Sequence, residues 1–247
     1  MSTAFLDQKN APYRNKQRGL KEHEKCMLRL VGATAPQGRL DVLDVGCADG
    51  LFLEAVSNKF ECGTVDGLDY DPEMVSIART RDYRAIRSDI YLDDVKALTQ
   101  QESALGPKRY DVIIASGILA FFEDQDEIVR SLWRHLNDDG MLFVFSKVIS
   151  HDVDMRYAVR AAGGLSWSDE RFLLSLASNR RLLGKYLSDV TVEHFELPFD
   201  LPAASTVNMH SSYTVQKADG SRMILTRHNV VAELAFLYGR RRETAEE

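Results

Sequence analysis

The sequence predicts an α/β fold with a doubly wound, mostly parallel sheet of the seven-stranded type and helices on both faces. Apolar, β-prone runs alternate with helix-like segments between residues 42 and 146. The run from Tyr110 to Leu119 is almost continuously apolar, which is expected of a parallel strand covered on both faces. A turn rich in small residues follows the first of these runs. Strand–helix alternation favours parallel strands joined by right-handed crossovers.

The composition indicates an ordinary soluble protein. Of 247 residues, 45% are hydrophobic and 28% charged, and the formal net charge of -6 gives no electrostatic reason to expect nucleic-acid binding. The three cysteines Cys26, Cys47 and Cys62 form no metal-type pair, and we interpret them as reduced thiols. The first ten residues become charged too early for a signal peptide, and no apolar run is long enough for a bilayer. We therefore expect a cytoplasmic protein without membrane contact.

The stretch from Val42 to Gly50 reads Val-Leu-Asp-Val-Gly-Cys-Ala-Asp-Gly and predicts a strand, a tight turn and the start of a helix. Such a turn presents free backbone N–H groups to a ligand and is typical of nucleotide sites. In the dinucleotide pattern G-x-G-x-x-G, counted from Gly46, the sixth position would be glycine or alanine. Here it is Leu51, which argues against NAD.

The segment Asp-x-Gly-x-Ala-x-Gly, beginning at Asp44, resembles the first motif of class I S-adenosylmethionine-dependent methyltransferases, (Asp/Glu)-x-Gly-x-Gly-x-Gly. One substitution separates the two, since Ala48 stands where the family has its middle glycine. The resemblance implies S-adenosyl-L-methionine as cofactor and S-adenosyl-L-homocysteine as product. It also implies that the turn contributes the cofactor-binding residues Asp44, Gly46, Cys47, Ala48 and Gly50.

A strand predicted over Gly63 to Tyr70 ends in a second acidic motif. Asp69 lies about 20 residues beyond the glycine turn, where a carboxylate can accept hydrogen bonds from two ribose hydroxyls. The segment Gly-Leu-Asp-Tyr-Asp-Pro-Glu-Met resembles the second motif of the family. That resemblance gives Asp69 the ribose, lays Tyr70 along the adenine and adds Met74 to the cofactor site.

Two further turns carry the resemblance. Ser88, Asp89 and Ile90 resemble the adenine-contacting turn, although Asp89 could instead cap a following helix. The turn Ala115-Ser116-Gly117 resembles the fourth motif of small-molecule methyltransferases, where it encloses the methyl group. The Asn-Pro-Pro-Tyr and Asp-Pro-Pro-Tyr forms associated with methylation of nucleobases and glutamine do not occur at this turn.

The N-terminal segment from Tyr13 to Gly32 has apolar residues at helical spacing and predicts an amphipathic helix. In the resembled family, a Tyr or Arg of this segment reaches the carboxylate of the cofactor. Tyr13 and Arg18 are the candidates here, and the alternative is a solvated helix face.

The remaining elements divide the chain into a cofactor half and a substrate half of one domain. We expect an N-terminal helical cover (1–38), the cofactor-binding half (39–146) and a substrate-side half (147–247) with a helical, substrate-covering insertion and antiparallel strands. Helices are expected over 51–60, 72–83, 124–136, 152–162 and 168–187, with Gly140 as a left-handed stop after the third. Strands are expected over 85–90, 141–146 and 190–197, and a hairpin over 212–216 and 222–226. For 232–238 strand and helix stay open.

A methyltransferase with an acceptor of high pKa needs a general base, most often histidine. His151 follows the fifth strand, at the edge where loops line an α/β crevice, and His210 lies in a polar stretch that could fold over the site. The apolar residues Phe121, Phe122 and Trp167 could form an acceptor wall or belong to the core.

The sequence thus favours in-line methyl transfer to an oxygen or nitrogen of a small-molecule acceptor, with no metal and no nucleic-acid partner. Two other functions stay open. One is an NAD(P)-type Rossmann oxidoreductase, and the other is a non-catalytic interaction or regulatory protein on the same fold. Neither the identity of the acceptor nor the oligomeric state follows from the residues.

Overall fold

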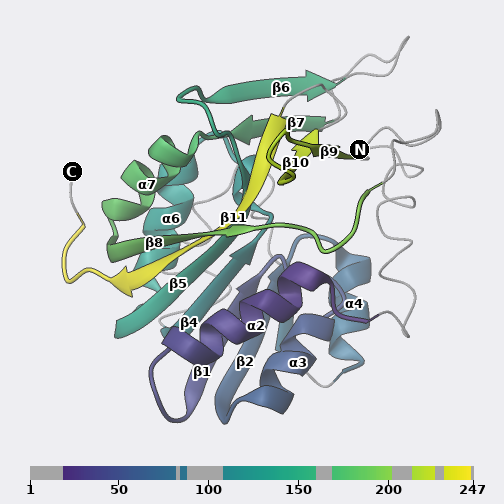
Figure 1. The fold of residues 1–247 in the computed structure, drawn as a ribbon. Helices are drawn as coiled ribbons and strands as arrows, with labels where there is room; N and C mark the ends of the chain where they lie inside the picture. Colours follow the sequence, from purple (N-terminus) through teal and green to yellow (C-terminus); the bar gives the residue numbers. More distant parts are fainter. Residues whose placement is uncertain are drawn as a thin grey trace.

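A computed structural model describes residues 19–81, 84–87, 108–159, 169–201, 213–225 and 231–245. Within these residues a nine-stranded mixed sheet is flanked by helices and accompanied by a two-stranded sheet (Figure 1). The α/β class and the sheet with helices are confirmed. The sheet is mixed and not mostly parallel, because four of its strand pairs are parallel and four antiparallel. The strand number exceeds the expected seven, because a C-terminal hairpin extends the sheet.

Five parallel strands form the first half of the sheet, in the order β3-β2-β1-β4-β5. Strand order reverses between β1 and β4, which creates a crevice beyond their carboxyl ends. Their bounds are β1 Leu40–Val45, β2 Cys62–Asp69, β3 Arg84–Arg87, β4 Tyr110–Ser116 and β5 Leu136–Val148.

The second half of the sheet is antiparallel. Strand β11 (Val231–Arg241) pairs with β5 on one side and with β8 (Leu187–Phe195) on the other. The predicted hairpin is confirmed as β9 (Tyr213–Gln216) and β10 (Arg222–Leu225), and β10 pairs with the first residues of β11. Because β11 runs against β5, the start of β11 and the end of β8 lie at the same edge as the carboxyl ends of β1 and β4.

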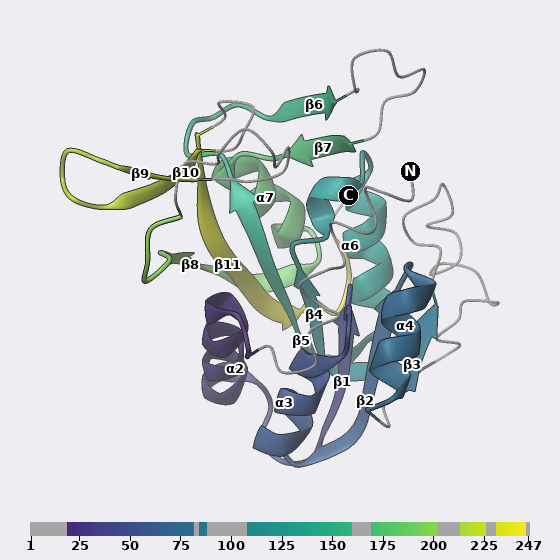
Figure 2. The ribbon, with the colours of Figure 1, turned by 90° about the vertical axis from the view of Figure 1, so that its right-hand side faces the viewer.

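Helices cover both faces of the sheet (Figure 1, Figure 2). On one face, α2 (Glu22–Thr34) and α3 (Leu51–Lys59) form a core cluster with Val42 and Ile114. On the other, α6 (Gln125–Arg134) and α7 (Leu176–Gly184) form a cluster with the adjacent residues Leu43 and Ile113. Neighbouring strand residues are therefore buried in opposite directions, which explains the continuous apolar runs.

Short elements join these layers. Helix α4 (Pro72–Arg79) lies beside β2 and β3, and its N-cap Asp71 accepts a 2.9 Å hydrogen bond from the Glu73 N–H. A 3-10 helix, η1 (Leu119–Phe121), follows β4. The two-stranded sheet of β6 (Met155–Val159) and β7 (Asp169–Leu173) lies beyond the carboxyl ends of the large sheet in both views, together with the β9–β10 hairpin (Figure 1, Figure 2).

Several predicted elements are wrong in type or extent. The expected helix over 152–162 is replaced by β6, and the expected helix over 168–187 begins with β7 before α7 starts after the Ser175 cap. The undecided 232–238 belongs to β11. In each of these cases pairing with another strand decides the conformation, and the local pattern of apolar residues does not report such pairing.

Gly140 does not end a helix in a left-handed conformation, so that prediction is also wrong. Helix α6 ends at Arg134, and Gly140 lies within β5 beside a register irregularity with β4. A Cβ at this glycine would lie 2.9 Å from the carbonyl oxygens of both Asn137 and Tyr110. Glycine is required here for close backbone approach.

We predict that any side chain at Gly67 in β2 disturbs the packing of its neighbours and destabilises the fold. Its Cβ would lie 2.6 Å from the Cys47 Sγ and 2.7 Å from the Leu53 Cδ1, so Gly67→Ala should lower the free energy of unfolding by about 1–3 kcal/mol. Gly184→Ala is the matched control, because a Cβ there meets nothing within 4 Å. Denaturant titration of both variants checks this, and equal stabilities would contradict it.

Candidate functional site

The turn between β1 and α3 has an unusual backbone. Gly46, Ala48 and Gly50 all have positive φ, at 84°, 48° and 74°. Ala48 is one of two non-glycine residues with positive φ in the described part of the chain. A non-glycine residue in this conformation raises the free energy of the folded state by of order 1–3 kcal/mol. The N–H groups of Gly46 and Cys47 donate to the carbonyl oxygen of Leu68, at 2.8 and 2.9 Å. The turn is therefore held against β2.

Contacts with α4 also fix the turn. A Cβ on Gly50 would lie 3.0 Å from the Cβ and 3.2 Å from the Cα of Ala78. Glycine at this position therefore allows α4 to pack closely against the turn. Arg81, just beyond α4, donates from Nε to the carbonyl oxygen of Asp49 at 2.9 Å and forms an ion pair with Glu54. The end of α4 thereby closes over the turn.

Asp69, the last residue of β2, links the turn to the next loop. One of its carboxylate oxygens accepts from the Ala48 N–H at 2.8 Å, and the other from the Asp71 N–H at 2.9 Å. A carboxylate can accept more than two hydrogen bonds, so these bonds are compatible with a further bond to a ligand hydroxyl. Asp69 thus lies at the turn, as a ribose ligand would require.

A cavity of about 70 Å³ opens over the turn. Helix α2 and the residue before it form one wall, β1 and the turn form the floor, and β4 forms the far side. The lining residues are Lys21, His23, Glu24, Met27, Asp44, Gly46, Cys47, Ala48, Phe52, Ile114 and Ser116.

The cavity wall contains a buried carboxyl group. Burial, together with the smaller effect of the charges of Glu24 and Asp69, raises the pKa of Asp44 from its ordinary value near 3.8 to about 8. Burial likewise raises the pKa of the Cys47 thiol well above its usual range, so this cysteine is not a thiolate nucleophile at neutral pH. The electrostatics of the cavity suit a cation.

One histidine lines this cavity. The His23 ring stacks on Phe145 with centroids 4.5 Å apart and planes 3° apart. Phe145 pairs in register with Ser116, another lining residue. His23 is therefore held at the sheet edge between β4 and β5. His151 is exposed on the bend after β5, at the same edge.

The structure brings five of the predicted cofactor residues together as cavity lining: Asp44, Gly46, Cys47, Ala48 and Ser116. Gly50 and Asp69 hold the turn from outside the lining. Tyr70 follows β2 and is half-buried, while Met74 is buried in α4.

Other predicted residues lie in the core or outside the described chain. Ala115 packs in the core cluster on the α6 face, and the Gly117 N–H donates to the Phe145 carbonyl oxygen at 2.8 Å. Phe122 is buried and Phe121 packs against the same cluster. Outside the described residues lie Tyr13, Arg18, Ser88, Asp89, Ile90, Trp167 and His210.

Sequence reasoning missed the contribution of α2. The spacing of apolar residues predicts an amphipathic N-terminal helix, but it does not identify Lys21, His23 and Glu24 as lining residues. Nothing in the spacing of apolar residues says which turn of the helix overhangs the sheet edge. Phe52 and Ile114 were missed because apolar strand and helix residues are more often core.

Among the described residues, no group of three or more His, Cys, Asp or Glu side chains is placed to hold a metal ion. None of the helices in this part of the chain has the length and hydropathy needed to cross a membrane.

Comparison with known proteins points to one family. Residues 43–142 match the family described as Methyltransferase domain. A malonyl-[acyl-carrier protein] O-methyltransferase of Bacillus anthracis is 30% identical over 101 residues, covering 41% of this chain and 35% of that protein. A ubiquinone biosynthesis O-methyltransferase of Klebsiella pneumoniae subsp. pneumoniae is 32% identical over 102 residues, covering 41% of this chain and 40% of that protein. The chain thus spans two fifths or less of these relatives' lengths.

The fold has solved counterparts. The N-methyltransferase NodS from Bradyrhizobium japonicum WM9, crystallised with S-adenosyl-L-homocysteine, superposes with a TM-score of 0.52 at 17% identity. The alignment covers 97% of this chain and 98% of NodS. The likeness concerns the fold.

Asp44 is predicted to make folding pH-dependent. The pKa of Asp44 is about 8 in the folded protein and near 3.8 in the unfolded chain, so the unfolded chain loses this proton at lower pH. The stability that the protonated Asp44 contributes is therefore complete below pH ~4 and is lost as the pH rises toward 8. The slope is at most about 1.4 kcal/mol per pH unit. Asp44→Asn should remove that part of the decline, which unfolding curves of both proteins at pH 5, 6, 7 and 8 would measure. Parallel pH profiles would refute the burial argument.

Proposed function

We propose that this chain, which belongs to the class I S-adenosylmethionine-dependent methyltransferase family, transfers a methyl group to an oxygen or nitrogen of a small metabolite. The observation that carries the proposal is the coincidence of two findings. The segment that matches the family, residues 43–142, includes the glycine turn, and this turn forms the floor of the cavity bounded by Asp44 and Ser116.

The residues at the turn fit S-adenosylmethionine. Its sulfonium and ammonium groups are cations, and they would relieve the cost of ionising the buried Asp44 carboxyl near Glu24. Asp69 supports the ribose assignment, because its carboxylate lies against the turn at the end of β2. Gly46 and Gly50 allow the turn its left-handed backbone, which supports the open approach that a ligand would need there.

The bound cofactor would supply an activated methyl electrophile, so the chain's own residues have to bind, orient and exclude water. Helix α2 covers the cavity from one side and contributes the apolar Met27 to its lining. Phe52 of α3 is a second apolar lining residue. Ser116 and the turn after β4 would enclose the transferring group. Alignment of the acceptor with the methyl group is the main catalytic contribution expected of such a site.

A hydroxyl or ammonium acceptor must also lose a proton. His23 is the candidate base that lines the cavity, held flat against Phe145 and next to Ser116 in the strand register. His151 stays a candidate because it follows β5 at the same edge.

The acceptor class is also a proposal. The curated relatives are named as O-methyltransferases and NodS as an N-methyltransferase, and these names support both oxygen and nitrogen as acceptor atoms. A formal net charge of -6 favours a small molecule over nucleic acid.

Calorimetric titration should detect binding of both S-adenosylmethionine and S-adenosylhomocysteine. Asp69→Asn should weaken both by roughly tenfold, since one hydrogen bond between an ionised carboxylate and a hydroxyl is worth about 1.5–3 kcal/mol. Asp138→Asn is the control, because Asp138 is 87% exposed at the opposite edge of the sheet. If neither ligand produces heat at millimolar concentration, the proposed function is wrong. If Asp69→Asn binds both ligands with unchanged affinity, only the role of Asp69 as a cofactor ligand is wrong.

The choice of base can be tested with any acceptor found by screening metabolites for release of S-adenosylhomocysteine. His23→Gln should lower kcat by about 10²–10⁴ and remove the acidic limb of the pH profile. His151→Gln is made in parallel. If His151→Gln loses the limb and His23→Gln keeps it, the base is His151.

A further inference from the structure

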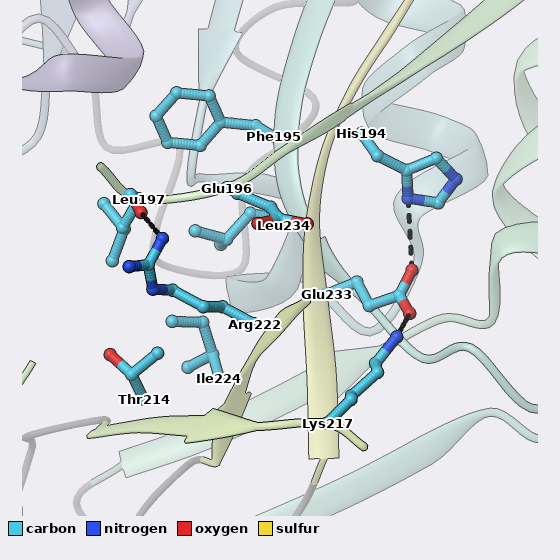
Figure 3. A pocket seen from close by; sticks show the side chains of 10 residues that line it. All are labelled: His194, Phe195, Glu196, Leu197, Thr214, Lys217, Arg222, Ile224, Glu233 and Leu234. Carbon is cyan, nitrogen blue, oxygen red and sulfur yellow. Dashed lines mark hydrogen bonds and ion pairs between the residues drawn. The ribbon is translucent and has the colours of Figure 1, made fainter. Parts of the chain in front are cut away.

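A second, larger cavity lies at the same edge of the sheet, beneath the β9–β10 hairpin (Figure 3). Its volume is about 270 Å³, near the lower end of the range for small-molecule sites, roughly 300–1,000 Å³. The end of β8, both hairpin strands and the start of β11 enclose it. The lining residues are His194, Phe195, Glu196, Leu197, Thr214, Lys217, Arg222, Ile224, Glu233 and Leu234.

The side of this cavity around Lys217 is electrostatically compensated. Lys217 Nζ lies 3.0 Å from one Glu233 oxygen, and His194 Nδ1 lies 3.1 Å from the other. Burial alone would raise the pKa of Glu233, but the hydrogen bonds and charges of Lys217, Ser150 and His194 hold it below its usual value. The negative charge of Glu196 also raises the pKa of Lys217, to which Glu233 contributes most. Both carboxylates of the lining therefore act on this lysine.

Arg222, on the other side, has two weak partners. Its Nη1 donates to the carbonyl oxygen of Leu197 at 3.5 Å (Figure 3). Its Nε donates to Asp200 at 2.9 Å, but the Asp200 side chain is 74% exposed, and such surface pairs contribute little. A guanidinium carries five donors in a planar fork that matches a carboxylate or phosphate. Figure 3 shows this group on the same side of β11 as Phe195, Leu197 and Ile224. The cation thus lies beside an apolar wall.

A row of rings joins the two cavities. Phe195, in the lining of the second cavity, makes an edge contact with Phe145 at 5.7 Å. Phe145 in turn stacks under His23, in the lining of the first. Phe236 packs against both phenylalanines, at 4.8 and 5.5 Å. Both cavities therefore border the same row of packed rings.

We propose that the second cavity binds the methyl acceptor, and that the acceptor is an amphipathic molecule whose anionic group pairs with Arg222 while its apolar body lies on Phe195 and Leu234. A carboxylate and a phosphate share the required chemistry. The assignment as acceptor site rests on the proposed methyl transfer, whereas the preference for an apolar anion follows from the cavity itself.

Three probes with the same apolar body distinguish the contribution of charge to binding from that of apolar burial. They are 3-phenylpropanoate, 3-phenylpropyl phosphate and the neutral 3-phenylpropanol. Titration of the full-length protein, followed by amide NMR shifts, should move the resonances of Thr214, Ile224 and Leu234 with at least one anion. The stronger of the two anions identifies the natural group as carboxylate or phosphate. Arg222→Gln should weaken the better anion by about tenfold and leave the alcohol unchanged.

Arg109→Gln is the matched control, since Arg109 forms an exposed ion pair with Asp138 at 3.3 Å, directly before β4 and away from the cavity. It should leave all three affinities unchanged. Arg222→Lys should restore part of the affinity, because lysine keeps the charge but not the fork.

The proposal is overturned if neither anion moves the cavity resonances, if Arg222→Gln binds them as well as the parent, or if 3-phenylpropylamine binds better than the anions. The acceptor role requires simultaneous occupancy, so an anion that S-adenosylhomocysteine displaces also overturns it. Failure of S-adenosylhomocysteine to bind, with the anion still bound at Arg222, overturns the methyltransferase function and the acceptor role together while leaving the anion site itself intact.

Discussion

The hydrogen bonds that tie the turn after β1 to the end of β2 determine the rest of the site. Leu68 receives the N–H groups of Gly46 and Cys47, and Asp69 receives that of Ala48. With these bonds in place, the backbone cannot relax from its left-handed conformations, and the strain at Ala48 is sustained by its neighbours. Gly67 makes the arrangement sterically feasible by leaving room for Cys47. Helix α3 starts from this turn and α4 closes over it, so both inherit their positions from β1 and β2.

Much of the structure between residues 39 and 146 could be predicted, because the sequence signals there are local. A continuous apolar run, a glycine turn and the Asp71–Pro72 cap each specify their own conformation, and β1, α3, β2 and α4 follow in the expected order. The N-cap and the first proline of α4 leave little choice of helix start.

Residues 147–247 could not be predicted to the same extent, because their strands depend on pairing with other segments, which the local pattern does not report. Strand β6 exists by pairing with β7, and β11 acquires strand character between β5 and β8. The same limit applies to the site. Asp44 and Ser116 lie in motifs, but His23 reaches the cavity only through the way α2 lies across the sheet, which no spacing encodes.

Among the described residues, the hairpin β9–β10 joins the large sheet through two residue pairs, Ile224 with Ala232 and Leu225 with Val231. By contrast, β11 is paired along eight positions with β5. The hairpin is thus an appendage whose sequence can drift, lengthen or be exchanged with little effect on the folding of the sheet. If it selects the acceptor, substrate preference in this lineage can evolve separately from fold stability, and grafting a hairpin from a relative becomes a rational route to changing specificity.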